Sequence, residues 1–260
     1  MAITITSNIA SLGAQKNLQV TQDNLNRSIS RLSSGYKIVT AQDDPAGLAV
    51  SERLRAQVRG IKQAEKNAND GISFLQVAEG ALAEVSNVLI RMRELSVQAS
   101  NGTLSSADRG FLNTEFLQLR SEIDRISEST KFNNLNILNG TFSQGAASLI
   151  IQIGLYDTPE DMLTVTLRNV GTEALGSGTM LNSITISQSA GQARNVIKFI
   201  DAAIDDVSQS RSVVGSQLSR LVSVVQAQLS LGQNLTAAVS RIRDVDVAEE
   251  TSQLTRSQIL

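Results

Sequence analysis

Residues 31–59 read RLSSGYKIVTAQDDPAGLAVSERLRAQVR, and this stretch indicates how the fold is organised. Gly35 suits the left-handed conformation that often follows the last turn of a helix. Asp43 and Asp44 can cap a following helix, and Pro45 is tolerated in a first helical turn. We therefore predict a helix that ends just before Gly35, a short polar joint, and a second helix that begins at Pro45.

The second helix is predicted to be very long. Apolar residues recur every three or four positions from Leu54 to Ala99, and no proline interrupts them. A helix of about 55 residues would measure about 80 Å at 1.5 Å per residue. A third helix is predicted around the apolar positions from Leu112 to Ile126, and the Asn-rich residues 130–143 predict a loop.

The period of the pattern changes in the middle of the chain. Residues 148–154 and 163–168 alternate like strands, and residues 157–161 between them have the composition of a turn. We predict a β-hairpin here. A third strand over 183–187 is an open alternative, and the Gly-rich residues 171–178 predict a flexible connector.

The last long apolar seam runs over residues 193–242 with a heptad spacing, which favours coiled-coil packing. We expect it to be broken only at Arg211, Gln228 and Gly232.

Both chain ends are predicted to form helices whose apolar seams need a partner. The N-terminal helix covers residues 9–34, and a second joint at 244–246 precedes a helix that begins near Val247. Such seams pair with each other or with a neighbouring copy of the chain. The predicted self-assembly residues are Leu18, Leu25, Ile29, Leu32, Val239 and Ile242.

The predicted fold is mainly α, a long coiled-coil-like helical bundle forming a rod, with a small β-hairpin element and terminal helices in an inner core region. The predicted segments are an N-terminal inner-core helix and joint (1–43), the N-terminal part of an outer-core helical domain (44–143), the β-hairpin and connector (144–190), the long C-terminal outer-core helix (191–243) and the start of a C-terminal inner-core helix (244–260).

The composition excludes several classes of chemistry. The 260 residues include no Cys and no His, which removes thiol nucleophiles, imidazole bases, disulfides and Cys/His metal sites. Paired acids such as Asp43–Asp44, Asp205–Asp206 and Glu249–Glu250 diverge on a helix, so caps and solvated faces explain them better than a metal site. We predict no enzyme, no cofactor and no metal.

Charge and hydropathy limit the partners. The formal net charge of −2 gives no general attraction to nucleic acid, and acidic Glu52 and Glu65 accompany the basic residues of 53–62. No run of about 18 apolar residues predicts a membrane span. The first ten residues have neither a basic nor an apolar region of a cleaved signal peptide.

Residues 31–59 closely resemble the N-terminal signature of bacterial flagellins. Further stretches that carry the resemblance are NANDGIS (67–73), RMRELSVQA (91–99), TKFNNLNILNG (130–140) and RIRDVDVA (241–248). The resemblance implies a secreted structural subunit that self-assembles with other flagellin subunits into the flagellar filament for swimming motility. It also implies export by the flagellar type III pathway without a cleaved signal peptide, assisted by a chaperone that binds the C-terminal helix.

The end of the chain departs from the family pattern. In flagellins the C-terminal helix continues for several turns beyond a motif like that at 257–260. The resemblance therefore implies a truncated C-terminal helix, a largely missing chaperone site, poor polymerisation, and mobility of about the first 35 residues.

The resemblance also implies recognition by innate immune receptors. Arg91, Leu95 and Glu115 resemble the patch that Toll-like receptor 5 recognises on many flagellins. An ordinary surface and helix seam explains the same residues, and the patch could double as a subunit interface. The set that resembles the epitope of the plant flagellin receptor is Arg31, Gly35, Asp43, Asp44, Gly47 and Leu48.

Two other functions stay open from the sequence. One is a flagellin-related hook–filament junction protein, which shares similar terminal helices. The other is a cytosolic helical signalling rod, which needs no β-hairpin between its two arms.

Overall fold

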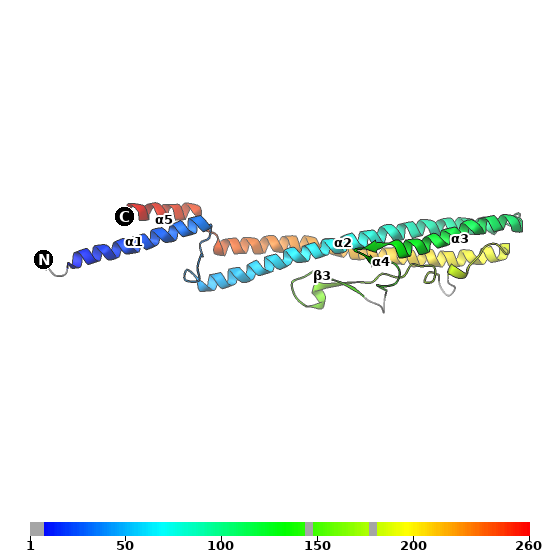
Figure 1. Ribbon diagram of the computed structural model, residues 1–260, viewed down its shortest axis with the longest axis horizontal. Helices are drawn as coiled ribbons and strands as arrows, with labels where there is room; N and C mark the ends of the chain where they lie inside the picture. The colour runs from blue at the N-terminus through cyan, green and yellow to red at the C-terminus, as the bar shows by residue number, and fades with distance from the viewer. Residues whose placement is uncertain (1–7, 144–147, 177–180) are drawn as a thin grey trace. The chain divides into compact units, whose positions relative to one another are not determined.

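A computed structural model of the chain, which describes residues 8–143, 148–176 and 181–260, is mainly α-helical (Figure 1). The helices are α1 (Ile9–Ser34), α2 (Pro45–Ala99), α3 (Ser106–Ser129), α4 (Ala190–Arg243) and α5 (Val247–Ile259). The predicted end of the first helix before Gly35 and the predicted start of the second at Pro45 are both confirmed. No helix among the described residues has the length and apolar character that a bilayer span requires.

Contacts within the chain divide it into two compact units. One unit contains the residues up to Lys62 together with those from Leu229 onward, and the other is Gln63–Gln228. Both boundaries fall inside the long helices α2 and α4 rather than at the joints. The segment boundaries expected from the sequence at the joints therefore stay predictions.

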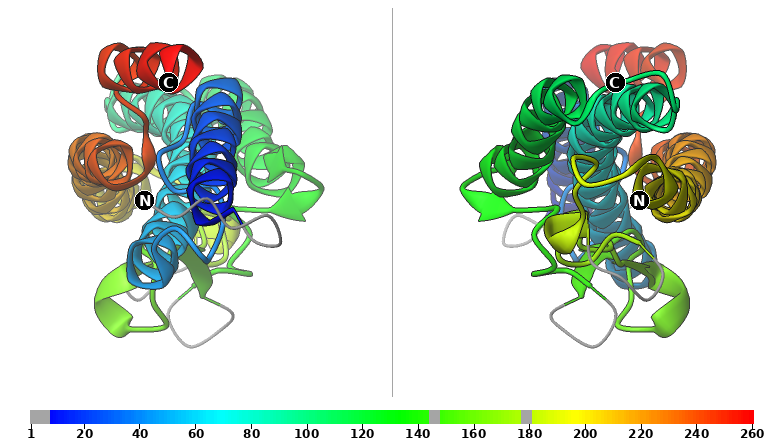
Figure 2. Two further views of the ribbon diagram at one scale, coloured as in Figure 1. Left: turned by 90° about the vertical axis from the view of Figure 1, so that its left-hand side faces the viewer. Right: turned by 90° about the vertical axis from the view of Figure 1, so that its right-hand side faces the viewer.

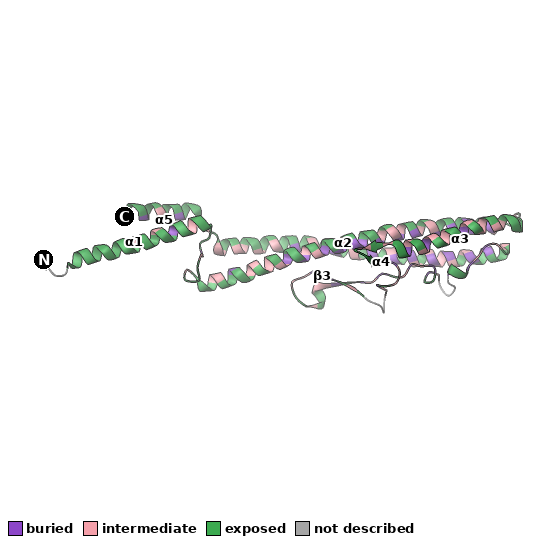
Figure 3. Cartoon of the chain, in the orientation of Figure 1, coloured by how far each residue is buried: buried purple, intermediate pink, exposed green. Residues whose placement is uncertain are grey.

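The second unit holds the main hydrophobic core. Within it, α3 runs beside α2 and α4, and buried residues concentrate where these helices meet (Figures 2 and 3). The largest fully buried side chains on the three helices are Leu75, Leu82, Leu89, Met92, Leu95, Phe116, Ile123 and Ile200.

The buried residues of α4 follow the heptad spacing without the interruption that the sequence predicted at Gln228. Its buried positions in this unit are Ala193, Val196, Ile200, Ala203, Val207, Ser210, Val214, Leu221 and Gln228. Gln228 was expected to break the seam, but it is only 8% exposed and continues it. Its side-chain amide donates to the backbone oxygen of Ile153, which explains how a polar residue is accommodated at a core position.

A small hairpin lies where the sequence predicted only a loop. Strand β1 (Lys131–Phe132) pairs antiparallel with β2 (Leu135–Asn136). The two connecting residues, Asn133 and Asn134, have φ values of 47° and 65°. A two-residue turn with positive φ at both positions suits a tight hairpin, and Asn tolerates that conformation.

The predicted β-hairpin is confirmed in a shorter form. Strand β3 (Leu149–Gln152) pairs antiparallel with β4 (Met162–Val165), with Leu149 opposite Val165. A 3₁₀ turn, η1 (Pro159–Asp161), precedes β4. The alternative third strand at 183–187 is wrong, because this region forms the 3₁₀ turn η2 (Leu181–Ser183) and irregular chain. Part of the predicted connector, 177–178, lies outside the described residues.

Candidate functional site

The first joint, residues 35–44, is organised around one carboxylate. Gly35 has a φ of 73° and ends α1 as a left-handed cap. The Asp43 carboxylate accepts hydrogen bonds from the Thr40 backbone N–H (3.0 Å), the Thr40 hydroxyl (3.1 Å) and the Val39 N–H (3.3 Å). The hydrogen bond from the Thr40 backbone is the main reason that the pKa of Asp43 is lowered. Asp43 therefore shapes the joint rather than the helix after it.

The cap of α2 is supplied by the second acid. The Asp44 side chain accepts a hydrogen bond of 2.9 Å from the Gly47 N–H. A Cβ atom at Gly47 would lie 2.8 Å from Cδ1 of Ile38, a residue that is buried in the joint. The absence of a side chain at position 47 thus lets the joint fold back against the first turn of α2.

The second joint is capped in the same way and pairs with the first. The Asp246 carboxylate accepts hydrogen bonds from the Ala248 N–H (2.9 Å) and the Glu249 N–H (3.3 Å) at the start of α5. The joints are linked by two backbone hydrogen bonds, from Lys37 N–H to Arg243 O (2.6 Å) and from Val245 N–H to Gly35 O (3.1 Å). The two ends of the chain are thereby connected through their joints.

The Arg243 side chain stabilises the contact between the two joints. The guanidinium carbon lies 4.5 Å from the centroid of the Tyr36 ring, which is a cation–π contact. The same guanidinium pairs with the Glu52 carboxylate on α2, and this hydrogen bond is the main cause of a lowered pKa at Glu52. The Arg243 side chain is only 12% exposed. It therefore connects α4, the first joint and α2.

Arg31 makes a second electrostatic link. It lies 3.8 Å from the Asp43 carboxylate in the joint and 3.6 Å from the Glu250 carboxylate on α5. Glu250 is 9% exposed, so its charge is held at a helix–helix contact. Together with the capping carboxylates, this arrangement orients α1 and α5 relative to their joints.

The predicted self-assembly residues differ in how far the single chain covers them. Leu18 and Ile29 are 65% and 48% exposed, whereas Leu25 and Leu32 are half-buried where α5 packs beside the second half of α1 (Figure 1). Val239 and Ile242 near the end of α4 are also half-buried. The exposed apolar side chains of α1 are Ile9, Leu12, Leu18, Val20 and Ile29. Several apolar side chains of α1, Leu18 and Ile29 on one face among them, are thus left uncovered within the described part of the chain.

The three residues predicted as an immune-receptor patch do not form one surface. Arg91 on α2 donates to the Glu115 carboxylate on α3 at 2.8 and 3.0 Å and also pairs with Glu94 at 2.9 Å. Leu95, however, is 1% exposed and belongs to the core. This agrees with the apolar stripe predicted from Leu54 to Ala99, because the face of α2 that carries Leu95 packs on the neighbouring helices. Only the Arg91–Glu115 pair is accessible.

The six residues predicted as a plant-receptor epitope are all used by the first joint or the helices beside it. Arg31 and Asp43 pair electrostatically, Gly35 ends α1, and Asp44 caps α2. The remaining two, Gly47 and Leu48, are half-buried in the first turn of α2.

The acid pairs act as caps and ion-pair partners. Asp206 pairs with Arg168 at 2.8 Å, and Glu250 pairs with Arg31. The described residues contain no group of three or more acids, His or Cys that could hold a metal ion. The sequence argument missed the roles of Tyr36, Arg243 and Glu250, since no periodic pattern marks a contact between joints from opposite ends of the chain.

Comparisons with known proteins agree with this architecture. The model of the bacterial flagellin N-terminal helical region matches residues 5–143, and that of the bacterial flagellin C-terminal helical region matches residues 197–260. A flagellin from Halalkalibacterium halodurans is 40% identical over 256 residues, which cover 98% of this chain and 91% of the relative. A flagellin from Bacillus subtilis is 38% identical over 281 aligned positions, covering 98% and 92% of the two chains.

A solved structure extends the comparison to the fold. The crystal structure of Bacillus cereus flagellin superimposes with a TM-score of 0.53 at 32% sequence identity, covering 67% of this chain and 94% of that chain.

Proposed function

The chain belongs to the bacterial flagellin family, and we propose how its residues take part in the filament that this family builds. It is a structural subunit of the bacterial flagellar filament, which lies outside the cell. The single observation that carries this function is the match of both family models, together with relatives near 40% identity over almost the whole chain.

We propose that the exposed face of α1 is a subunit contact. Leu18 and Ile29 are 65% and 48% exposed in the single chain, although apolar helix faces are normally buried. Four more predicted residues are half-buried. Two lie on α1 beside the exposed pair, and two lie near the end of α4: Leu25, Leu32, Val239 and Ile242. We propose that they complete the same subunit contacts. Burial of such side chains between copies stabilises the filament at roughly 25 cal/mol per Å².

The experiment introduces charge on this face. The double variant Leu18→Asp/Ile29→Asp is expected to abolish seeded polymerisation, because a carboxylate buried without a partner is strongly unfavourable. The control Gln22→Asp/Asn26→Asp adds the same charge at exposed polar positions of α1 and should polymerise normally. Sedimentation and negative-stain imaging give the result. Normal filaments from the Leu18/Ile29 variant would contradict the proposed seam.

The alternative functions have less support. The relatives near 40% identity are flagellins, which favours a filament subunit over a junction protein. A signalling rod needs no hairpin between its two helical arms, so the β3–β4 hairpin favours a filament subunit over such a rod. We also infer that the chain has no enzymatic activity, since it lacks His and Cys, and hydrolysis that co-purifies with the protein would overturn this.

We further propose that the Arg91–Glu115 pair is a contact for Toll-like receptor 5. The pair is supported by its accessibility, with side chains 50% and 43% exposed. Arg91→Ala is expected to lower activation of receptor-bearing reporter cells at least tenfold. Arg125→Ala, which removes an arginine of α3 with a 63% exposed side chain, should leave activation unchanged. Equal activity of both variants would contradict the proposal.

Two partners and the export route remain proposals from the family. We propose export through the flagellar type III pathway, with an export chaperone that binds the α5 region. Recognition by the plant flagellin receptor is a further proposal, and it concerns a segment that the folded chain uses as its first joint. Capture of the purified chaperone by the chain, and loss of capture when α5 is removed, tests the first of these.

A further inference from the structure

One aromatic side chain of the second unit is conspicuously exposed. Phe111, in the second turn of α3, is 76% exposed. The chain has six phenylalanines, all within the described residues, and the other five are buried or half-buried. In a protein with only 3% aromatic residues, a phenylalanine left in solvent points to a contact that the single chain does not make.

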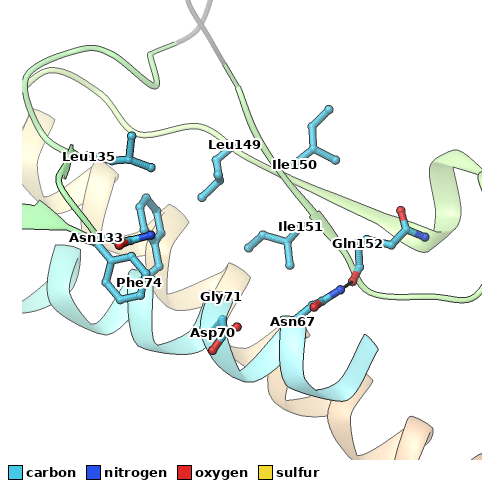
Figure 4. A pocket seen from close by; sticks show the side chains of 11 residues that line it. Asn67, Asp70, Gly71, Phe74, Asn133, Leu135, Leu149, Ile150, Ile151 and Gln152 are labelled. Carbon is cyan, nitrogen blue, oxygen red and sulfur yellow. Dashed lines mark hydrogen bonds between the residues drawn. The ribbon is translucent and has the colours of Figure 1, made fainter. Parts of the chain in front are cut away.

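The same unit carries an apolar hollow, which we call the β3 cavity (Figure 4). Its volume is about 370 Å³, and it lies between α2, the β1–β2 hairpin and β3. The apolar side chains that line it are Phe74, Phe132, Leu135, Leu149, Ile150 and Ile151. Leu135 and Ile150 are 47% and 57% exposed, so the β3 cavity is open at the surface.

We propose that Phe111 of one copy of the chain inserts into the β3 cavity of a second copy in the filament. A cavity of about 150 Å³ already holds a benzene molecule, so a phenyl ring fits the β3 cavity together with part of its helix. Phe74 and Phe132 lie edge to face with ring centroids 5.6 Å apart. A third ring would extend this cluster in the geometry that aromatic side chains prefer.

The two features cannot meet within one chain. The Arg109 guanidinium donates to the Ala99 backbone oxygen at 3.0 Å, which ties the start of α3 to the C-terminal end of α2. The β3 cavity lies at Gly71 on α2. At 1.5 Å per residue, Gly71 and Ala99 are about 42 Å apart along the helix. The contact therefore joins different copies head to tail, and such a heterologous contact continues as an open filament where its rotation does not close.

Charged residues lie beside both features. Asp108 and Glu115 lie one helical turn before and after Phe111 on the same face of α3. Asp70 lines the β3 cavity, and the exposed Lys66 and Lys131 are next in sequence to the lining residues Asn67 and Phe132. Because Arg91 pairs with Glu115 and Arg109 lies two residues before Phe111, these charges largely offset one another, and the apolar fit carries the contact.

Cross-linking between copies tests the contact directly. The chain has no cysteine, so Thr114→Cys beside Phe111 and Lys66→Cys beside the β3 cavity are the only reactive thiols in a double variant. A short bis-maleimide is expected to produce a ladder of dimers, trimers and longer species from filaments but not from monomers. The control pair Thr114→Cys/Val222→Cys, with the second thiol exposed on α4, should give no ladder.

The inference rests on the proposed filament function, and the outcomes separate the two. Filaments that form with both thiols reactive but yield no ladder would overturn the Phe111 contact and leave the filament function intact. If the unmodified chain forms no filament even on sheared filament seeds, both fail.

A second measurement tests the energetic part of the contact. Phe111→Ala should raise the critical concentration for polymerisation about tenfold or more, because the buried apolar area of the ring is lost. Phe111→Leu keeps an apolar side chain at the position and should restore most of the affinity. An unchanged critical concentration for Phe111→Ala would overturn the proposal.

Discussion

Asp43 stabilises the first joint because its carboxylate accepts two backbone hydrogen bonds and one from a hydroxyl. These bonds favour the ionised form, and the Thr40 N–H is the largest cause of the lowered pKa of Asp43. The unfolded chain therefore binds more protons near this pKa than the folded chain does. The contribution of Asp43 to the free energy of unfolding is present above about pH 4 and is lost as the pH falls through the folded pKa.

The lowered pKa of Asp43 predicts the effect of a single substitution at this position. Asp43→Asn should lower the free energy of unfolding by about 1 kcal/mol at pH 7, because weaker acceptors replace charged ones. The difference from the unmodified chain should shrink at pH 3, where Asp43 itself becomes protonated. Denaturant titrations at the two pH values measure the difference. The exposed Asp157→Asn serves as the control, and a gap at pH 3 as large as that at pH 7 would contradict the argument.

At the scale of the element, two glycines inside α2 have different reasons to be there. A Cβ atom at Gly71 would lie 2.6 Å from Cδ1 of Ile151, so this glycine permits the close approach of β3 to α2. Nothing lies within 4 Å of a Cβ atom at Gly80, which is exposed. The same substitution to alanine therefore introduces a close contact at position 71 and none at position 80.

The pair makes a matched test. Gly80→Ala should raise the free energy of unfolding by up to about 1 kcal/mol, the difference in helix propensity between the two residues. Gly71→Ala should give a smaller gain than Gly80→Ala or a net loss, because the tip of the buried Ile151 side chain must move and this offsets the gain in helix propensity. Thermal or denaturant unfolding of the monomers decides between them. Equal effects of the two substitutions would mean that β3 does not pack closely on α2.

At the scale of the whole molecule, the first unit is made from opposite ends of the sequence. Its joints meet through backbone hydrogen bonds, and Arg243 and Arg31 add long-range electrostatic links. Closing so long a loop costs entropy before any contact is gained, so we expect this unit to form after the second unit. The second unit has its own hydrophobic core, so we expect it to fold without the chain ends.

Removal of α5 tests this division. A variant without residues 247–260 should show faster amide exchange in the second half of α1, since Leu25 and Leu32 lose their cover and Arg31 loses Glu250. Exchange in α3 should not change. The control variant lacks only the exposed residues 258–260 and should behave like the full chain. Unchanged exchange in α1 after removal of α5 would show that the two helices do not stabilise each other.

The sequence by itself determined the helices, the helix boundaries at Gly35, Pro45 and Val247, the β3–β4 hairpin and the family. Hydrophobic period and capping chemistry are local, so Gly35 and Pro45 could be assigned without coordinates. The residues Asn133 and Asn134 also favour a tight turn. The strands beside this turn have two residues each, which is too short for an alternating hydrophobic pattern to be recognised.

Tertiary structure alone decided the features that depend on distant partners. Gln228 was expected to interrupt a seam that it continues by donating to Ile153. The pairing of the joints through Arg243 and Tyr36 and the β3 cavity are also of this kind. The physical reason is that burial and long-range hydrogen bonds depend on which faces meet in space, and residues close in sequence do not specify that.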